Sequence, residues 1–236
     1  MNFEIQQPPV ALGADISLRS FAAIEAELRH YPQAKRFTAE EQAVITRLIH
    51  TTTCFDQVLD HIYFSPDAIR RTQSLLTDGA RIIVDVTMIQ AGLSRFYLDT
   101  YGNEVVCTIH DPEIFAMARQ QQTTRSYAAA VAAIRQNQAS PIILVCGNAP
   151  TFIYAAIRTL IEEKIDPARV ALLLFPVGFV NVAESKAYAK KFSAAYDVAS
   201  IIMEGRFGGS TLGVAALHAI YKLIRDYDGT EHYNGK

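Results

Sequence analysis

The stretch Pro-Ile-Ile-Leu-Val-Cys-Gly-Asn-Ala-Pro-Thr at residues 141–151 decides the fold class of this chain. Residues 142–146 are apolar without polar alternation, which is the pattern of a strand buried on both faces of a parallel sheet. Gly147 permits a tight turn, and Pro150 suits the first turn of a helix, where a missing N–H costs little. We therefore expect a central strand that leads into a helix through a turn with free N–H groups. In open parallel sheets, ligands bind at such strand ends.

Working outward, four more segments read as strands, and each is followed by a helical pattern. They are residues 81–86, 104–109, 170–175 and 198–203. This alternation predicts a three-layer α/β architecture with a flavodoxin-like, five-stranded parallel sheet in the order 2-1-3-4-5. The helix expected at 88–96 is interrupted near Gly92.

The first 80 residues read differently, because they carry helical patterns at about 16–30, 38–50 and 68–76 and no obvious strand. We expect residues 1–236 to form one domain. In it, a helical extension at 1–80 packs on a parallel α/β body at 81–228.

The composition excludes several classes of function. The 22 basic and 24 acidic residues nearly cancel, so no general positive field favours nucleic acid, and a polyanionic ligand needs a local basic pocket. The 3 cysteines are isolated, which argues against a disulfide framework or a zinc site. The apolar run at 170–180 is too short to span a membrane, and the N-terminus lacks a signal-peptide pattern. We expect a cytoplasmic protein.

Three strand ends read as ligand loops, at residues 147–151, 176–181 and 204–210. On a parallel sheet these loops lie along one edge, where their glycines would let a ligand approach backbone N–H groups. Arg206 and Lys186 add positive charge, so the loops could together hold several carboxylates or phosphates. The alternative, that the glycines only form tight turns, has equal weight. The loop residues in question are Asn148, Gly178, Lys186, Arg206, Gly208, Gly209 and Ser210.

Two further places could carry chemistry. Thr124, Arg125 and Ser126 open a helix, and the simpler interpretation of this tripeptide alone is a helix cap with a solvated arginine. His50 is the best acid–base candidate, since histidine changes its charge near neutral pH and a helix C-terminus favours its protonated form. Arg47, one turn earlier, opposes that charge. The chain has no H-E-x-x-H, nucleophile elbow, G-x-G-x-x-G after a strand or Walker A lysine, so a nucleotide cofactor is not supported.

Taken in order, these motifs resemble the precorrin-8X methylmutase family, also called cobalt-precorrin-8 methylmutase or precorrin isomerase. The three loops carry the resemblance together with Glu184-Ser185-Lys186. Further matches follow the family's order from about Ser20 to Leu217. They are Ser20-Phe21, Arg47 with Ile49-His50, Asp85 with Met88 and Gly92, and Thr124-Arg125-Ser126.

The resemblance implies an isomerase of cobalamin synthesis that moves a methyl group from C-11 to C-12 of precorrin-8 or cobalt-precorrin-8. The product would be hydrogenobyrinate or cobyrinate. It also implies a homodimer with a corrinoid substrate and no separate cofactor, and we expect no metal site, nucleic-acid partner or membrane partner. His50 matches the family's catalytic histidine and is expected to act as a general acid. Substrate binding is implied at the loop residues named above and at Ser20, Arg47, Met88, Gly92, Thr124, Arg125 and Ser126.

The chain departs from the family pattern at three places. At residues 51–55, after His50, the family usually has small residues and a glycine. At Asn181 the family typically has a small residue, and at His218 it commonly has asparagine. Two other functions stay open. A flavodoxin-like redox protein would bind flavin at the same edge, although the turn at 85–88 fits a Ser/Thr-rich phosphate loop poorly. A non-catalytic tetrapyrrole-binding protein would bind the corrinoid without converting it.

Overall fold

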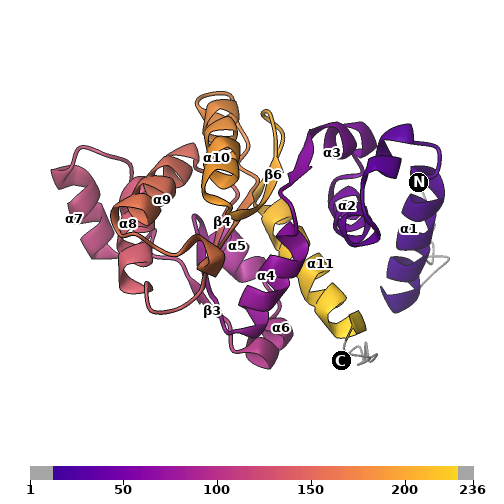
Figure 1. Ribbon diagram of the computed structural model, residues 1–236, viewed down its shortest axis with the longest axis horizontal. Coiled ribbons are helices and arrows are strands. Elements are labelled where there is room, and N and C mark those ends of the chain that lie inside the picture. Colours follow the sequence, from indigo (N-terminus) through magenta and orange to yellow (C-terminus); the bar gives the residue numbers. More distant parts are fainter. Residues whose placement is uncertain (1–12, 228–236) are drawn as a thin grey trace, which may run out of the picture.

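The computed structural model describes residues 13–227 and has a six-stranded sheet at its centre (Figure 1). The strands are β1 (Ile62–Phe64), β2 (Arg81–Val84), β3 (Glu104–Val106), β4 (Ile142–Cys146), β5 (Val170–Leu174) and β6 (Ala199–Met203). They lie in the order β1-β6-β5-β4-β2-β3. Strands β2 to β6 are parallel and follow the expected 2-1-3-4-5 order, which confirms the predicted α/β class.

The prediction of five strands missed β1, which pairs antiparallel with β6 inside the segment expected to be only helical. Ile62 lies opposite Met203, and Phe64 lies opposite Ile201. Three residues are too few to show the two-residue period by which a strand is identified in sequence. The pairing of β1 with β6 identifies this segment as a strand, and that pairing is seen only in the three-dimensional structure.

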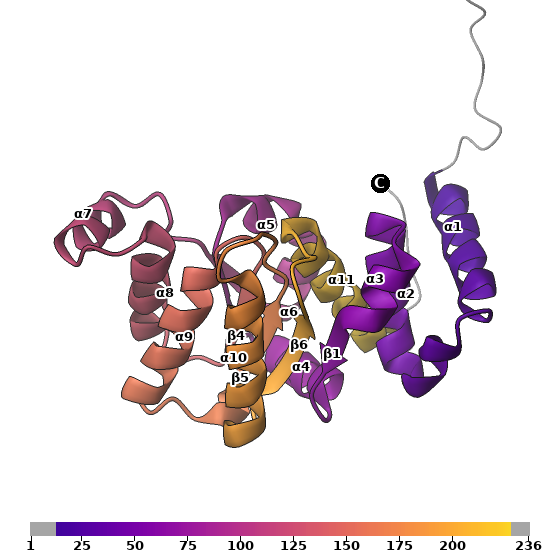
Figure 2. The same cartoon turned by 90° about the horizontal axis from the view of Figure 1, so that it is seen from above.

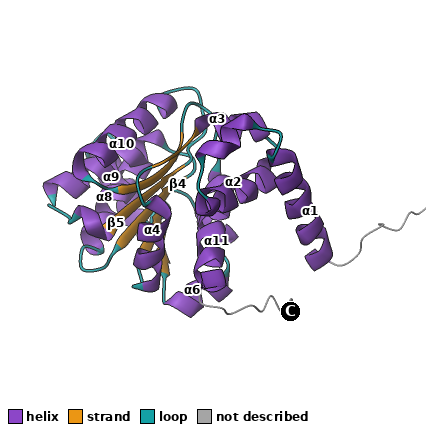
Figure 3. Cartoon of the chain, turned by 45° about the vertical axis from the view of Figure 1, so that its right-hand side comes forward, coloured by secondary structure: helices purple, strands orange, loops and turns teal. Residues whose placement is uncertain are grey.

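Helices cover both faces of the sheet (Figure 3). One face packs against α8 (Arg125–Gln136), α9 (Pro150–Glu162) and α10 (Val182–Tyr196). The other packs against α4 (Ala68–Thr77) and α11 (Ser210–Tyr227). The central strands are buried on both sides, as their unbroken apolar runs indicate.

The segment expected as one helix at 88–96 is two helices, α5 (Thr87–Gly92) and α6 (Arg95–Tyr101), so the expected interruption near Gly92 is confirmed. A Cβ at Gly92 would press on Val214 of α11, so the glycine allows α5 to approach that helix. Helix α7 (Pro112–Gln120) and the short turn η2 (Pro167–Arg169) complete this part of the chain.

The first helices stand beside the sheet (Figure 2). They are α1 (Gly13–Leu28), η1 (Pro32–Arg36), α2 (Ala39–Thr52) and α3 (Phe55–His61). Thr38 and Glu41 form a capping box that starts α2, and α2 packs along α11. Helix α3 was not predicted, because the polar residues around 51–56 resemble a loop.

Candidate functional site

A pocket of about 330 Å³ lies at the carboxyl edge of the sheet. It brings together four residues expected at the site, Thr124, Arg125, Ser126 and Asn148, with Thr87 and His110, which were not expected there. The hydroxyl of Thr124 caps α8 by accepting a hydrogen bond from the Tyr127 N–H, and it lies 2.8 Å from the Thr151 hydroxyl at the start of α9. The pocket wall is therefore built where two helices begin.

The Arg125 side chain provides the positive charge at this pocket. Its guanidinium lies 4.7 Å from the centre of the Phe115 ring on α7, and the residue is exposed. An exposed guanidinium over an aromatic ring keeps its donors available for a carboxylate. The pocket can therefore hold a carboxylate with a charged donor, hydroxyls and the Asn148 amide.

The loop after β4 differs from its prediction. Its N–H groups are not free, because the buried Asp85 carboxylate accepts hydrogen bonds from Gly147 at 2.9 Å, Asn148 at 2.7 Å and Ala149 at 2.7 Å. The Cys146 thiol also lies 3.3 Å from this carboxylate, and burial together with the Asp85 charge raises its pKa well above the usual value. The loop can therefore contribute the Asn148 side chain, but not the backbone amides of residues 147–149.

The loops after β5 and β6 are bound to each other. The Gly178 N–H donates to the Arg206 carbonyl, and the Gly209 N–H donates to the Phe175 carbonyl at 2.6 Å. The two loops therefore form one rim along the carboxyl edge.

Lys186 is buried beneath this rim, and its ammonium donates to the carbonyls of Gly205 at 3.0 Å and Phe207 at 2.8 Å. Burial lowers the pKa of Lys186 to about 8. Its charge is directed into the protein, in contrast to the charge expected to face a ligand. Arg206 is exposed beside the Phe179 ring, so it supplies the outward positive charge of this rim.

Packing explains two of the loop glycines. A Cβ at Gly147 would collide with the backbone of Ser210, the buried first residue of α11, and one at Gly208 would collide with the carbonyls of Phe175 and Pro176. Gly178 and Gly209 have φ values of 149° and 141°, where other residues are strained. The tight-turn interpretation accounts for these glycines without any ligand.

His50 lies near the C-terminus of α2, on an exposed surface. Its Nδ1 atom is 2.7 Å from the Ser20 hydroxyl of α1, and its ring packs 4.8 Å from that of Phe21. The Arg47 guanidinium lies 5.2 Å from the centre of the same Phe21 ring. Four residues matched by the family resemblance therefore form one cluster, the His50 cluster: Ser20, Phe21, Arg47 and His50.

The end of α2, which carries His50, lies toward the same edge of the molecule as the strand ends. Strand β1 is antiparallel to β6 and begins opposite Met203, the last residue of β6, so α3 and the end of α2 precede it at the carboxyl edge. Figure 2 shows α1 and α2 at one end of the molecule and α7 and α8 at the other, and Arg125 of the pocket is the first residue of α8. The exposed apolar residues Met88, Val177, Phe179 and Val180 belong to α5 and the β5 loop, which lie between them.

His218 lies on α11 near the His50 cluster. Its Nε2 atom accepts a hydrogen bond from the Ser94 N–H at 3.0 Å, and its ring packs beside Tyr97. Burial and the charge of Arg47 lower the pKa of His218 to about 4, so its ring is neutral at physiological pH. With Nε2 as the acceptor, the proton of the neutral ring is on Nδ1.

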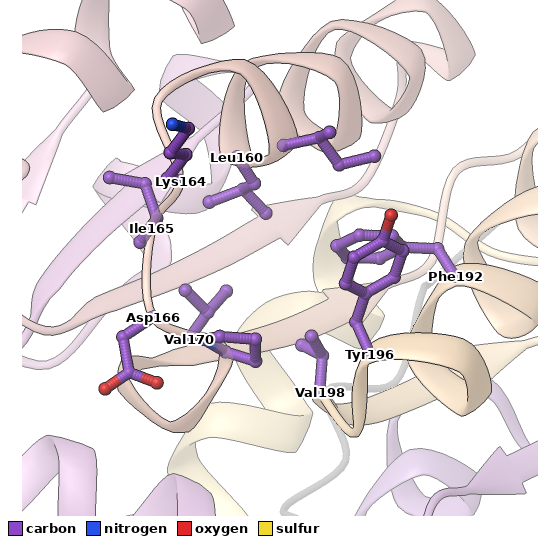
Figure 4. Close-up of a pocket in the computed structure, with 10 residues that line it drawn as sticks. Leu160, Lys164, Ile165, Asp166, Val170, Phe192, Tyr196 and Val198 are labelled. Carbon is purple, nitrogen blue, oxygen red and sulfur yellow. The ribbon is translucent and has the colours of Figure 1, made fainter.

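A second pocket, of about 280 Å³, lies at the opposite edge of the sheet between α9 and α10 (Figure 4). It is lined mainly by apolar side chains, including Leu160, Phe192, Tyr196 and Val198, and by none of the expected site residues. Within residues 13–227 no three His, Cys, Asp or Glu side chains are grouped to hold a metal ion. Nor does that part of the chain contain a helix with the length and apolar character to span a membrane.

Comparisons with known proteins agree with this geometry. Residues 15–223 match the family described as precorrin-8X methylmutase. The chain is 36% identical over 208 residues to the precorrin-8X methylmutase of a Sinorhizobium species, covering 88% of this chain and 93% of that protein. It is 36% identical over 216 residues to the cobalt-precorrin-8 methylmutase of Leptospira interrogans, covering 90% of this chain and 94% of that protein. The crystal structure of the precorrin-8X methylmutase from Thermus thermophilus has a TM-score of 0.75 and 37% identity, covering 90% of this chain and 98% of that chain.

Proposed function

Because the chain belongs to the precorrin-8X methylmutase family, an isomerase family of cobalamin biosynthesis, we propose that it moves a methyl group from C-11 to C-12 of the corrinoid ring. The observation that carries the proposal is the His50–Ser20 pair, 2.7 Å apart, at the same edge as the Arg125 pocket. An acid and an anion-binding site at one edge match a macrocycle fringed with carboxylates.

His50 is the proposed general acid, and the Ser20 contact decides which of its atoms acts. Since Nδ1 lies against the Ser20 hydroxyl, Nε2 is the atom left to face the substrate. In the protonated ring, Nδ1–H donates to Ser20 and Nε2–H donates a proton or a charged hydrogen bond to a ring nitrogen. That polarises the conjugated system and lowers the barrier to a concerted [1,5] methyl shift. A positioned acid typically contributes about 10²–10⁴-fold.

Substrate binding is proposed along the whole carboxyl edge. A pocket of about 330 Å³ suits one carboxylate side chain of the substrate rather than the macrocycle, so Arg125, Thr124, Ser126 and Asn148 would anchor one corner. Arg206 and Arg47 would meet other carboxylates, and the exposed apolar residues Met88, Phe179 and Val180 would cover the ring. The rim formed by the loops at Gly178 and at 208–210 would shape the approach of the substrate. Gly92 would contribute through α5, one helical turn after Met88. Lys186 would act by holding the rim.

We also propose a homodimer working in the cytoplasm, with residues 1–236 acting as one domain. Leu18 supports the dimer, because this apolar side chain is 66% exposed on α1 and would be covered by a second copy. The relatives carry both precorrin-8X and cobalt-precorrin-8 names, so both substrate forms belong in the test.

The test mixes the purified protein with precorrin-8, or with its cobalt form, and follows the visible spectrum. We expect conversion by the wild type and by His61→Ala, a matched exposed histidine at the end of α3. His50→Ala should bind the coloured corrinoid without converting it. Wild-type turnover by His50→Ala would refute the role of His50. Binding without conversion by the wild type would favour the non-catalytic tetrapyrrole carrier, and a yellow protein with flavin absorbance would favour the redox protein.

A further inference from the structure

Asp85 follows β2 and is fully buried, although nothing in its sequence neighbourhood explains a buried charge. Its carboxylate accepts three backbone hydrogen bonds from the loop after β4 and lies beside the Cys146 thiol. Among residues 13–227 no ion pair includes Asp85. Backbone donors therefore stabilise this carboxylate, as they do in anion-binding turns.

Asp85 binds the loop after β4, and this loop lies at the point of the sheet edge where a ligand is expected. Strands β2 and β4 are neighbours, and the chain leaves them toward opposite ends of the sheet, so their carboxyl ends form the switch point where ligands of such sheets bind. Without Asp85, the amides of Gly147, Asn148 and Ala149 at the start of α9 would offer a place for an incoming anion. The carboxylate of the protein itself already fills that place.

The same bonds set the direction of Asn148. This residue is exposed and lines the Arg125 pocket, while the residues on either side of it are buried and bound to Asp85. Gly147 packs against Ser210 of α11, so the loop is fixed from two sides. Asp85, Gly147 and Ala149 do not line the pocket, whereas Asn148 does.

We propose that Asp85 is a positioning residue for substrate recognition, a role that rests on the proposed function. It holds the β4–α9 loop so that the side-chain amide of Asn148 stays beside Arg125. Its carboxylate also occupies the place where the backbone amides of the loop would otherwise bind an anion. A substrate carboxylate is thereby directed to the Arg125 guanidinium. Asp85 touches no substrate atom and acts through Asn148.

The test is a double-mutant cycle of corrinoid conversion with Asp85→Asn, Asn148→Ala and the double variant. Asp85→Asn keeps the size of the side chain but turns an NH₂ group toward N–H donors, so the loop loses its anchor. We expect each single change to raise KM about tenfold, with kcat within about twofold. The double variant should also stay near tenfold, since both changes remove one interaction. Asp78→Asn, at the exposed end of α4, is the matched control and should leave KM unchanged.

A hundredfold rise in KM for the double variant would overturn the proposal, as would a loss confined to kcat. Amide hydrogen exchange of the wild type gives a second measurement in case Asp85→Asn does not fold. The amides of Asn148 and Ala149 should exchange at least about 100-fold more slowly than in an unstructured chain. Unprotected exchange there would also overturn the proposal. If the wild type fails to convert either corrinoid, the proposed function fails instead, and the exchange result stands by itself.

Discussion

The Ser20 hydroxyl lies 2.7 Å from Nδ1 of His50, which joins α1 to α2 across 30 positions of sequence. The Phe21 ring packs against the same imidazole, so two consecutive residues of α1 fix the position and the orientation of His50. An exposed histidine without these contacts would sample several rotamers. Helix α1 therefore contributes to the candidate site through the histidine it orients.

Ser20→Ala should lower kcat by about tenfold, because one side-chain hydrogen bond contributes about 0.5–1.5 kcal/mol and here orients the acid. KM should change little if the bond acts on the chemical step. Steady-state conversion of the corrinoid, followed by its visible spectrum, measures both values.

Ser17→Ala is the matched control, since Ser17 lies on the same helix one turn earlier and is also half-buried. It should keep the wild-type kcat. Equal losses in the two variants would mean that α1 packing, rather than the Ser20–His50 contact, supports activity.

His218 should make the protein sensitive to acid. Its pKa is held near 4 in the folded state by burial and Arg47, against 6.5 for an ordinary histidine. Between these values the unfolded chain binds a proton that the folded chain does not, so stability is complete above pH 6.5 and falls as pH falls toward 4. The pKa difference between the folded and unfolded states sets the size of this loss of stability. Partial exposure of the ring screens the charge and reduces the loss to about 2 kcal/mol.

Urea unfolding at several pH values, compared with His218→Gln, measures this contribution. The glutamine oxygen can accept the Ser94 N–H but does not titrate, so the variant should lose less stability between pH 6.5 and 4. Parallel stability curves for the two proteins would show that His218 is not the acid-sensitive group.

The five parallel strands could be predicted from sequence because their signal is local. Residues 142–146 and 170–174 are apolar at every position, and both became strands with every residue buried. Thr124 also acts as the predicted cap. In each case neighbours in sequence determine the structure, so a pattern suffices.

The loop after β4 shows why other features could not be predicted. Its glycine and proline correctly indicated a turn, but the acceptor of its amides is Asp85, 62 positions before Gly147. The burial of Lys186 likewise depends on carbonyls 19 and 21 positions away. The Ser20–His50 contact was not predicted, because the family resemblance named both residues but did not say that they meet. Contacts between segments that are far apart in the sequence produce no periodic pattern of residue types, so they could not be predicted from the sequence.

Lys186 should affect stability at high pH. Its pKa is lowered from 10.5 to about 8 in the folded protein, so between these values the unfolded chain holds a proton that the folded chain has released. Stability from this group therefore rises as pH increases from 8 to 10.5. The rise is at most about 3.5 kcal/mol, from about 1.4 kcal/mol per unit of pKa.

Lys186→Met removes the titration while keeping an unbranched chain. The difference in unfolding free energy between wild type and variant, measured by circular dichroism in urea, should move in favour of the wild type across this pH range. A difference that stays constant with pH would contradict the assignment.

Two glycines of the β6–α11 loop should respond differently to alanine. Gly205 has a φ of 70° with no atom within 4 Å of an added Cβ, so Gly205→Ala should cost only the left-handed strain, about 1 kcal/mol. A Cβ at Gly208 would instead meet the carbonyls of Phe175 and Pro176, which cannot move without disturbing the end of β5. Gly208→Ala should therefore cost about 3 kcal/mol or more and raise KM, because the rim carrying Arg206 must shift. Urea unfolding and corrinoid kinetics test both variants. Equal destabilisation would mean that strain, rather than close packing of the loops, accounts for the glycine at 208.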